Sequence, residues 1–113
     1  MAASANGTIV LVRFPFSDLS GAKLRPALVL AQVGRDDIVL CQITSRPYAD
    51  ALAIEIAASD LQRGTLDRTS YIRPGKLFTG NQTIIARDLG RLNHTKFNDT
   101  VKAVIDLFES SIR

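Results

Sequence analysis

The stretch Lys23 to Leu30 places two cations directly before an apolar, strand-like run. Pro26 stands between Arg25 and that run, and a proline has no backbone N–H to donate. It also holds the preceding residue in an extended conformation. The Arg25 guanidinium is therefore expected at the mouth of a buried strand, where it is poorly placed for packing and well placed to bind an anion.

The next apolar run, residues 38–43, also ends in polar side chains, which are Thr44, Ser45 and Arg46. Two consecutive strands therefore deliver hydrogen-bonding groups to their ends. Arginine binds a phosphate with two hydrogen bonds through its planar guanidinium, and a threonine hydroxyl can donate to a phosphate oxygen. This pattern is typical of a site for a phosphate-containing ligand.

The apolar runs predict a mainly β fold that ends in one α-helix. The expected strands are 8–14, 25–33, 38–43, 51–56, 70–78 and 82–86, with a turn at 79–81 between the last two. One short helical turn is expected at 59–64, between a capping residue at Ser59 and Gly64. From Phe97 to Ile112 the apolar residues recur every three or four positions, as on one face of an amphipathic helix, with Asn93 or Thr95 as its N-cap. Short strands followed by a terminal helix favour an α+β fold, a small SH3-like barrel of strongly curved antiparallel strands.

Arginine carries most of the positive charge of the chain. Ten of its 113 residues are Arg and four are Lys, and the formal net charge is +3, with a sequence pI of about 9.4. This balance leans toward a polyanionic partner. Composition alone leaves nucleic-acid binding and other roles equally open.

Length and composition predict one globular domain over residues 7–113, preceded by a frayed tail over residues 1–6. The single cysteine, Cys41, stands inside an apolar run. We expect it to be buried and reduced, as in a cytoplasmic protein. No apolar run approaches the roughly eighteen residues of a membrane span, and the first residues lack the pattern of a secretory signal.

Several motifs occur together in a characteristic order. RPALVL is followed by ITS, with TIVLVRFPFSDLSG before them and SYIRPGKLFT and TIIARDLGRL after them. In order and spacing they resemble the MazF/PemK family of toxin endoribonucleases of bacterial toxin–antitoxin systems, over residues 7–108. The resemblance implies a MazF- or CcdB-like barrel, a homodimer, a cognate antitoxin, and sequence-specific cleavage of single-stranded RNA without metal or organic cofactor.

The resemblance also implies roles for particular residues. It makes Arg25 and Thr44 the catalytic pair, and Arg73 a substrate contact. Some members of the family have an acidic residue two positions after the arginine at 73, where this chain has Gly75. Relatives usually have Asp where this chain has Thr8, a departure expected to affect the start of the strand more than catalysis.

Other residues are expected to bind the substrate. In the family, the loop after the first strand flanks the site, so Phe16, Asp18 and Lys23 are candidate RNA contacts, Phe16 by stacking on a base. Ser45 and Arg46 would extend the phosphate contact. The chain has one histidine, His94, which excludes an acid–base pair of two histidines within one subunit. We interpret His94 as a solvated or capping residue.

Two alternatives remain open. A CcdB-like toxin shares this architecture and acts by binding DNA gyrase, and a small barrel can serve only as an interaction module. The departures at Thr8 and Gly75 also leave open an inactive member of the family. The Arg25–Thr44 pair favours cleavage, because a protein that only binds has no need of it.

Overall fold

The computed structural model describes residues 4–15 and 22–113. Seven antiparallel strands form one sheet in the order β4-β6-β3-β2-β1-β7-β5. The strands are β1 (Thr8–Pro15), β2 (Ala22–Val33), β3 (Asp37–Thr44), β4 (Ile54–Ile56), β5 (Leu61–Gly64), β6 (Ser70–Asn81) and β7 (Ile85–Leu92). Two 3-10 turns, η1 (Ala58–Asp60) and η2 (Gln82–Ile84), and one helix, α1 (His94–Glu109), complete the described chain.

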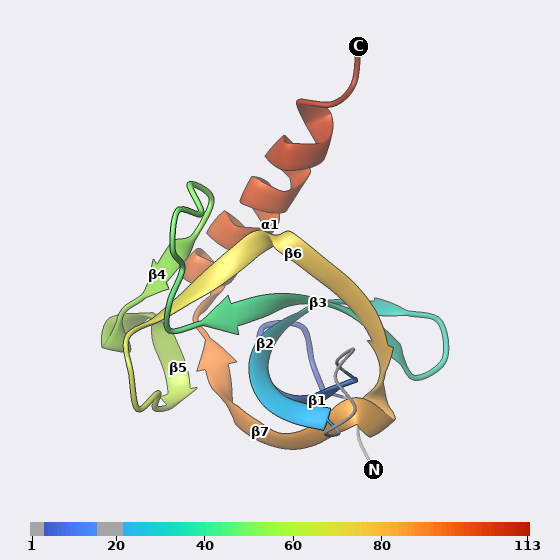
Figure 1. Cartoon of the computed structure of the whole chain (residues 1–113), viewed down its shortest axis with the longest axis vertical. Coiled ribbons are helices and arrows are strands. Elements are labelled where there is room, and N and C mark those ends of the chain that lie inside the picture. Colours follow the sequence, from blue (N-terminus) through green and yellow to red (C-terminus); the bar gives the residue numbers. More distant parts are fainter. Residues whose placement is uncertain (1–3, 16–21) are drawn as a thin grey trace.

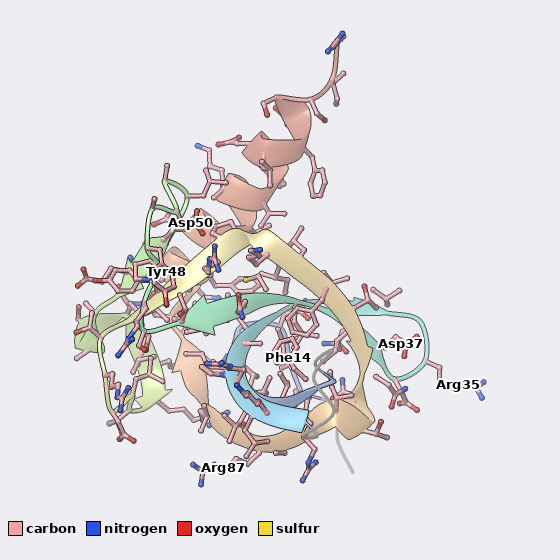
Figure 2. The ribbon with its side chains drawn as sticks, viewed as in Figure 1. Phe14, Arg35, Asp37, Tyr48, Asp50 and Arg87 are labelled. Atoms are coloured by element: carbon pink, nitrogen blue, oxygen red, sulfur yellow. The ribbon has the colours of Figure 1, made fainter. Side chains whose placement is uncertain are left out.

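The sheet curls on itself, which gives it two buried faces. Figure 1 shows β1, β2, β3, β6 and β7 bending into a half-closed barrel, from which α1 projects. Val10, Val12 and Val29 belong to the apolar cluster inside the curl, where Phe14 also packs (Figure 2). A second cluster, which includes Leu28 and Ile72, lies on the other face. The predicted α+β barrel of curved antiparallel strands is confirmed.

Helix α1 covers part of the second face. Phe97, Val101 and Val104 pack against the apolar cluster there, as the spacing of apolar residues predicted. Of the two predicted caps the structure selects Asn93, whose side chain accepts a hydrogen bond from the Lys96 N–H at 2.8 Å. None of the helices described here has the length and apolarity that a membrane crossing requires.

Several boundaries differ from the sequence prediction. The strand expected at 51–56 is only Ile54–Ile56, and the strand expected at 82–86 begins at Ile85, after η2, and continues to Leu92. The predicted helical turn at 59–64 is correct only for Ala58–Asp60, because Leu61–Gly64 pairs with β7 as a strand. The predicted turn after residue 78 is wrong, since β6 continues to Asn81, opposite Asp37. The Asn81 side chain then accepts from the Thr83 N–H at 3.0 Å and begins η2. Pairing with a strand distant in sequence outweighs the local turn preference at residues 61–64 and at residues 79–81.

Two smaller features concern the predicted tail and the thiol. Gln32 donates from Nε2 to the backbone oxygen of Ser4 at 2.9 Å and to Oδ1 of Asn6 at 3.0 Å. The division into a tail and one domain stays a prediction. Cys41 is fully buried on β3, as predicted, and burial raises the pKa of its thiol to about 12.

Candidate active site

The register between β2 and β3 brings Arg25 and Thr44 to one face of the sheet. Ala27 lies opposite Gln42 in this antiparallel pair, and residues directly opposite each other point to the same face. Side chains return to a given face every second residue, so the next positions on that face are Arg25 and Thr44. Both line a cavity of about 270 Å³, which we call the Arg25 hollow.

The exposure of the two side chains is compatible with substrate binding. Arg25 is exposed and Thr44 is half-buried, while Cys41 and Ile43, which point to the opposite face, are buried. The end of β3 therefore divides its residues between a packed face and an open one. Ser45 also lines the Arg25 hollow. The roles assigned to these three residues stay predictions.

The Thr44 hydroxyl organises the backbone that follows it. Its Oγ1 accepts a hydrogen bond from the Arg46 N–H at 3.1 Å and lies 3.3 Å from the Arg46 carbonyl oxygen, to which it donates. A serine or threonine that bonds two residues ahead in this way fixes a turn. Thr44 therefore lines the Arg25 hollow and also fixes the start of the loop over residues 45–53.

Arg73 lies one strand further across the sheet and is held by other side chains. It stands opposite Gln42 on β6. Its Nε donates to Asp50 Oδ2 at 2.7 Å, and its Nη1 donates to Gln42 Oε1 at 3.4 Å. The Arg73 and Asp50 side chains are only 21% and 13% exposed. Arg73 therefore adjoins the Arg25 hollow through Gln42 without lining it.

Asp50 supplies a carboxylate beside Arg73, a group that the sequence lacks at Gly75. The hydrogen bond from Arg73 lowers the pKa of Asp50, and a second hydrogen bond from the Leu52 N–H acts in the same direction. Asp50 therefore stays ionised and holds the loop over residues 45–53 against β6. Its distance in sequence from Arg73, 23 residues, explains why sequence spacing did not reveal the contact.

The remaining predicted contacts are distributed around this region. Lys23 stands opposite Phe14, two residues before Arg25, and is exposed. Arg46 is exposed on the loop after Thr44. Phe16 and Asp18 lie outside the described residues, so their part in the site stays a prediction.

Residues that the sequence prediction did not name also stand beside Arg25 and Thr44. Tyr71 lies directly opposite Thr44 on β6 and is half-buried on the same face. Asp67 and Arg68, from the loop between β5 and β6, line the Arg25 hollow. Gln42 was detectable, because it is a polar residue two positions before Thr44 in an apolar strand. The loop residues carried no such signal, since only tertiary folding brings them to the strand ends.

Two further features of residues 4–15 and 22–113 are the spacing of potential metal ligands and the surroundings of His94. In this part of the chain, no three His, Cys, Asp or Glu side chains are grouped closely enough to hold a metal ion. His94 is the first residue of α1, directly after the Asn93 cap, and it is exposed. This position agrees with a solvated residue at the start of a helix.

Solved structures share this fold at low sequence identity. An endoribonuclease from a mycobacterial species has a TM-score of 0.72 and 17% identity, covering 96% of this chain and 94% of its own. A MazE–MazF complex from Deinococcus radiodurans has a TM-score of 0.76 and 16% identity, with 96% and 98% covered. The toxin MazF-mt6 of Mycobacterium tuberculosis has a TM-score of 0.67 and 18% identity, with 90% and 96% covered.

The family itself is identified from the sequence. No curated protein sequence matches the chain. Residues 5–108 match the model of a family described as PemK-like, MazF-like toxin of type II toxin-antitoxin system. Because this match spans nearly the whole chain, the protein belongs to the PemK-like and MazF-like toxins of type II toxin–antitoxin systems.

Proposed function

We propose that this toxin is an endoribonuclease that cuts single-stranded RNA at a short sequence without a metal ion. The observation that carries the proposal is the convergence of Arg25 and Thr44 at one open hollow. Membership of the toxin family and the name of the similar mycobacterial endoribonuclease support it. Cutting messenger RNA would stop translation and arrest growth.

The proposed reaction uses the nucleophile that RNA itself carries. The 2′-oxygen forms a bond to the adjacent phosphorus, and the bond from phosphorus to the 5′-oxygen breaks. A carboxylate base accepts the proton of the 2′-hydroxyl, and the departing 5′-oxygen takes a proton from solvent water. The products are a 2′,3′-cyclic phosphate, which water can open to a 3′-phosphate, and a 5′-hydroxyl.

The residues of the Arg25 hollow can divide this work. A guanidinium keeps its proton at neutral pH, so Arg25 suits stabilisation of the charge that develops on the phosphate oxygens. The Thr44 hydroxyl can donate to one of those oxygens. Among the described residues that line the hollow, Asp67 alone carries a carboxylate. We therefore assign to Asp67 the acceptance of the 2′-hydroxyl proton.

The test combines substrate chemistry with variants. Purified protein is incubated with RNA in EDTA, beside the same RNA with a 2′-deoxy sugar at the cut site, and the fragment ends are mapped. We expect cyclic phosphate and 5′-hydroxyl ends from the first RNA and no cut at the substituted position. Cutting there would contradict the mechanism. Asp67→Asn is expected to lower the rate about 10²–10⁴-fold, as the loss of a general base does.

A second test separates cleavage from a role in binding alone. Arg25→Ala is expected to abolish toxicity in growing cells while leaving the protein folded by circular dichroism. A folded Arg25→Ala protein that remains equally toxic would favour a toxin that acts by binding its target.

We also propose a homodimer and a cognate antitoxin as partners. Ile105 and Phe108 on α1 are 48% and 56% exposed and border an apolar cleft of about 450 Å³ between α1 and the sheet. A second copy of the chain suits this cleft, because it would cover apolar side chains that the helix leaves open. The antitoxin would place a flexible segment over the RNA-binding surface. The similar Deinococcus radiodurans structure is a complex of MazF with MazE.

A further inference from the structure

The loop over residues 45–53 is held firmly at the edge of the candidate active site. Asp50 is its anchor, because the side chain binds Arg73 at 2.7 Å and accepts from the Leu52 N–H at 3.0 Å. The Asp50 N–H donates to the Pro47 carbonyl at 3.1 Å. At the start of the loop, the Thr44 hydroxyl accepts from the Arg46 N–H. The loop is therefore tied to the sheet and to itself by its own hydrogen bonds.

This loop presents an aromatic side chain to solvent. Tyr48 is 84% exposed, and its φ of +53° lies in the left-handed region, which bulky residues rarely adopt. Figure 2 shows Tyr48 and Asp50 on the same side of the molecule, far from the Arg35 turn. The strained backbone opposes folding, and the exposed ring contributes no packing that would offset it. Backbone strain of this kind concentrates at sites that bind a ligand.

Tyr48 borders a further cavity, of about 390 Å³, which we call the Tyr48 hollow. Arg73 and Lys76 also line it, and its volume is in the range of small-molecule sites, about 300–1,000 Å³. The Tyr48 and Arg25 hollows adjoin, because Arg73 of the former donates to Gln42 of the latter at 3.4 Å. An RNA strand with its phosphate at Arg25 would continue into the Tyr48 hollow.

The charges that line the Tyr48 hollow favour a site for a nucleobase over a site for a phosphate. Arg73 is paired with Asp50, so Lys76 adds the excess positive charge of this lining. One excess cation beside an exposed ring suits an uncharged nucleobase with a phosphate near its edge. Aromatic rings stack on unpaired bases in single-strand recognition, and cations follow the backbone.

We propose that the Tyr48 hollow is a nucleotide subsite in which Tyr48 stacks on one unpaired base beside the cleaved phosphate. Asp50 is a positioning residue for this subsite, acting through the loop that it ties to Arg73. The proposal rests on RNA being the ligand, as in the proposed function, and it adds a determinant of which sequence is cut.

The first experiment uses RNA that binds without being cut. The RNA carries a 2′-deoxy sugar at the mapped cut site and fluorescent 2-aminopurine at one neighbouring position at a time. We expect quenching at one position with the wild-type protein and with Tyr48→Phe, which keeps the ring. Tyr48→Ala should abolish the quenching, whereas the control Leu52→Ala, an exposed apolar residue of the same loop, should retain it.

The second experiment asks whether the ring and the base act on each other. RNA with an abasic ribose at the quenched position should be cut about tenfold less efficiently by the wild type, a loss that corresponds to one stacking contact. The same RNA should cause no further loss in Tyr48→Ala. Equal losses from the abasic RNA in both proteins would overturn the proposal.

The outcomes separate this proposal from the proposed function. A wild-type protein that cuts RNA with no quenching that depends on Tyr48 overturns the subsite and leaves the nuclease intact. A wild-type protein that cuts no RNA overturns the nuclease; the 2-aminopurine scan is then run along unmodified RNA, which such a protein leaves intact, and it still decides whether Tyr48 stacks on a base. Absence of both cleavage and quenching overturns both.

Discussion

Arg25 and Thr44 reach the same hollow for different physical reasons. Arg25 is extended by the proline that follows it, and Thr44 is the last residue of β3. The register of Ala27 with Gln42 then sets the two on one face. The sequence predicts this pair because both residues stand at recognisable ends of neighbouring apolar runs.

Replacing Arg25 by lysine tests which property of the guanidinium matters. Lysine keeps the positive charge but loses the planar pair of donors. We expect Arg25→Lys to keep part of the activity and Arg25→Ala to lose about 10²–10³-fold in kcat, as for a lost oxyanion donor. Single-turnover cleavage of RNA measures both. Equal losses in the two variants would show that the charge alone contributes nothing.

Asp50 shows what the sequence could not predict. Its contact with Arg73 joins a loop to a strand 23 residues away. No sequence motif contains both residues, so no motif predicts the contact. The role of Arg73 as a substrate contact stays a prediction, and the structure adds that its side chain is bound to Asp50 and Gln42. A long-range pair of this kind depends on the completed tertiary fold.

The Asp50–Arg73 pair predicts a pH-dependent contribution to stability. The pKa of Asp50 is lowered in the folded state, so the pair stabilises the protein above the unfolded pKa of about 3.9. That contribution is lost as the pH falls through the folded pKa. We expect Asp50→Asn to lower the free energy of unfolding by about 1–3 kcal/mol at pH 7.

Thermal unfolding at several pH values measures this contribution. The difference in Tm between the wild type and Asp50→Asn should shrink as the pH falls below about 3.9. Asp99→Asn, at an exposed position of α1, is the matched control and should change Tm little at any pH. A constant difference between the wild type and Asp50→Asn from pH 7 to pH 2 would contradict the ion pair.

At the scale of elements, β5 shows how tertiary pairing overrides a local signal. A capping residue at Ser59 and a glycine at Gly64 predicted a helical turn, but the turn ends at Asp60 and the chain pairs with β7. Gly64 lies opposite Gly90 in this pair. The two backbones approach so closely that a Cβ on Gly64 would stand 2.6 Å from Gly90 Cα and overlap the Leu89 carbonyl oxygen.

Gly64→Ala should therefore destabilise the protein more than an alanine at an open glycine. Gly64 has a φ of +83°, and Gly34 has a φ of +56° with nothing within 4 Å of an added Cβ. Gly34→Ala bears only the backbone penalty, roughly 1–2 kcal/mol. We expect Gly64→Ala to lower Tm further, by about 4 °C for each additional kcal/mol, in differential scanning calorimetry. Equal Tm values would show that β5 moves away from β7 at little cost.

The accuracy of the strand predictions depends on the same competition between local turn preference and pairing with distant strands. The strands at 8–14, 25–33 and 38–43 were predicted close to their observed bounds because apolar runs and turn residues agree there. Later in the chain, Gly80 and Asn81 resemble a turn, yet both pair with β3. Glycine and asparagine tolerate either conformation, so their local preference is too weak to decide.

At the scale of the whole molecule, α1 extends beyond the sheet that it covers (Figure 1). Its first turns pack on the core, whereas Phe108 in its last turn is 56% exposed and Ile112, beyond its end, is 75% exposed. The spacing of apolar residues predicted a single stripe along the helix. It could not predict where the chain's own sheet ends and leaves the stripe open.

Phe108→Asp tests the proposed dimer. A charge in the apolar cleft between α1 and the sheet carries a desolvation penalty, so we expect the variant to be monomeric, at 12.3 kDa. Light scattering after size-exclusion chromatography should give twice that mass for the wild type. Lys102→Asp, at an exposed position of α1, should remain dimeric. A dimeric Phe108→Asp protein would place the contact elsewhere.

The sequestered sulfur on β3 has a practical consequence for studying this toxin. Cys41 is the sole cysteine, and with its thiol buried and its pKa near 12 it should scarcely react with maleimide reagents. A cysteine introduced at the exposed hairpin tip, as in Arg35→Cys, would then be the one labelled position. A single dye placed there would report on subunit exchange without any change to the native chain interior.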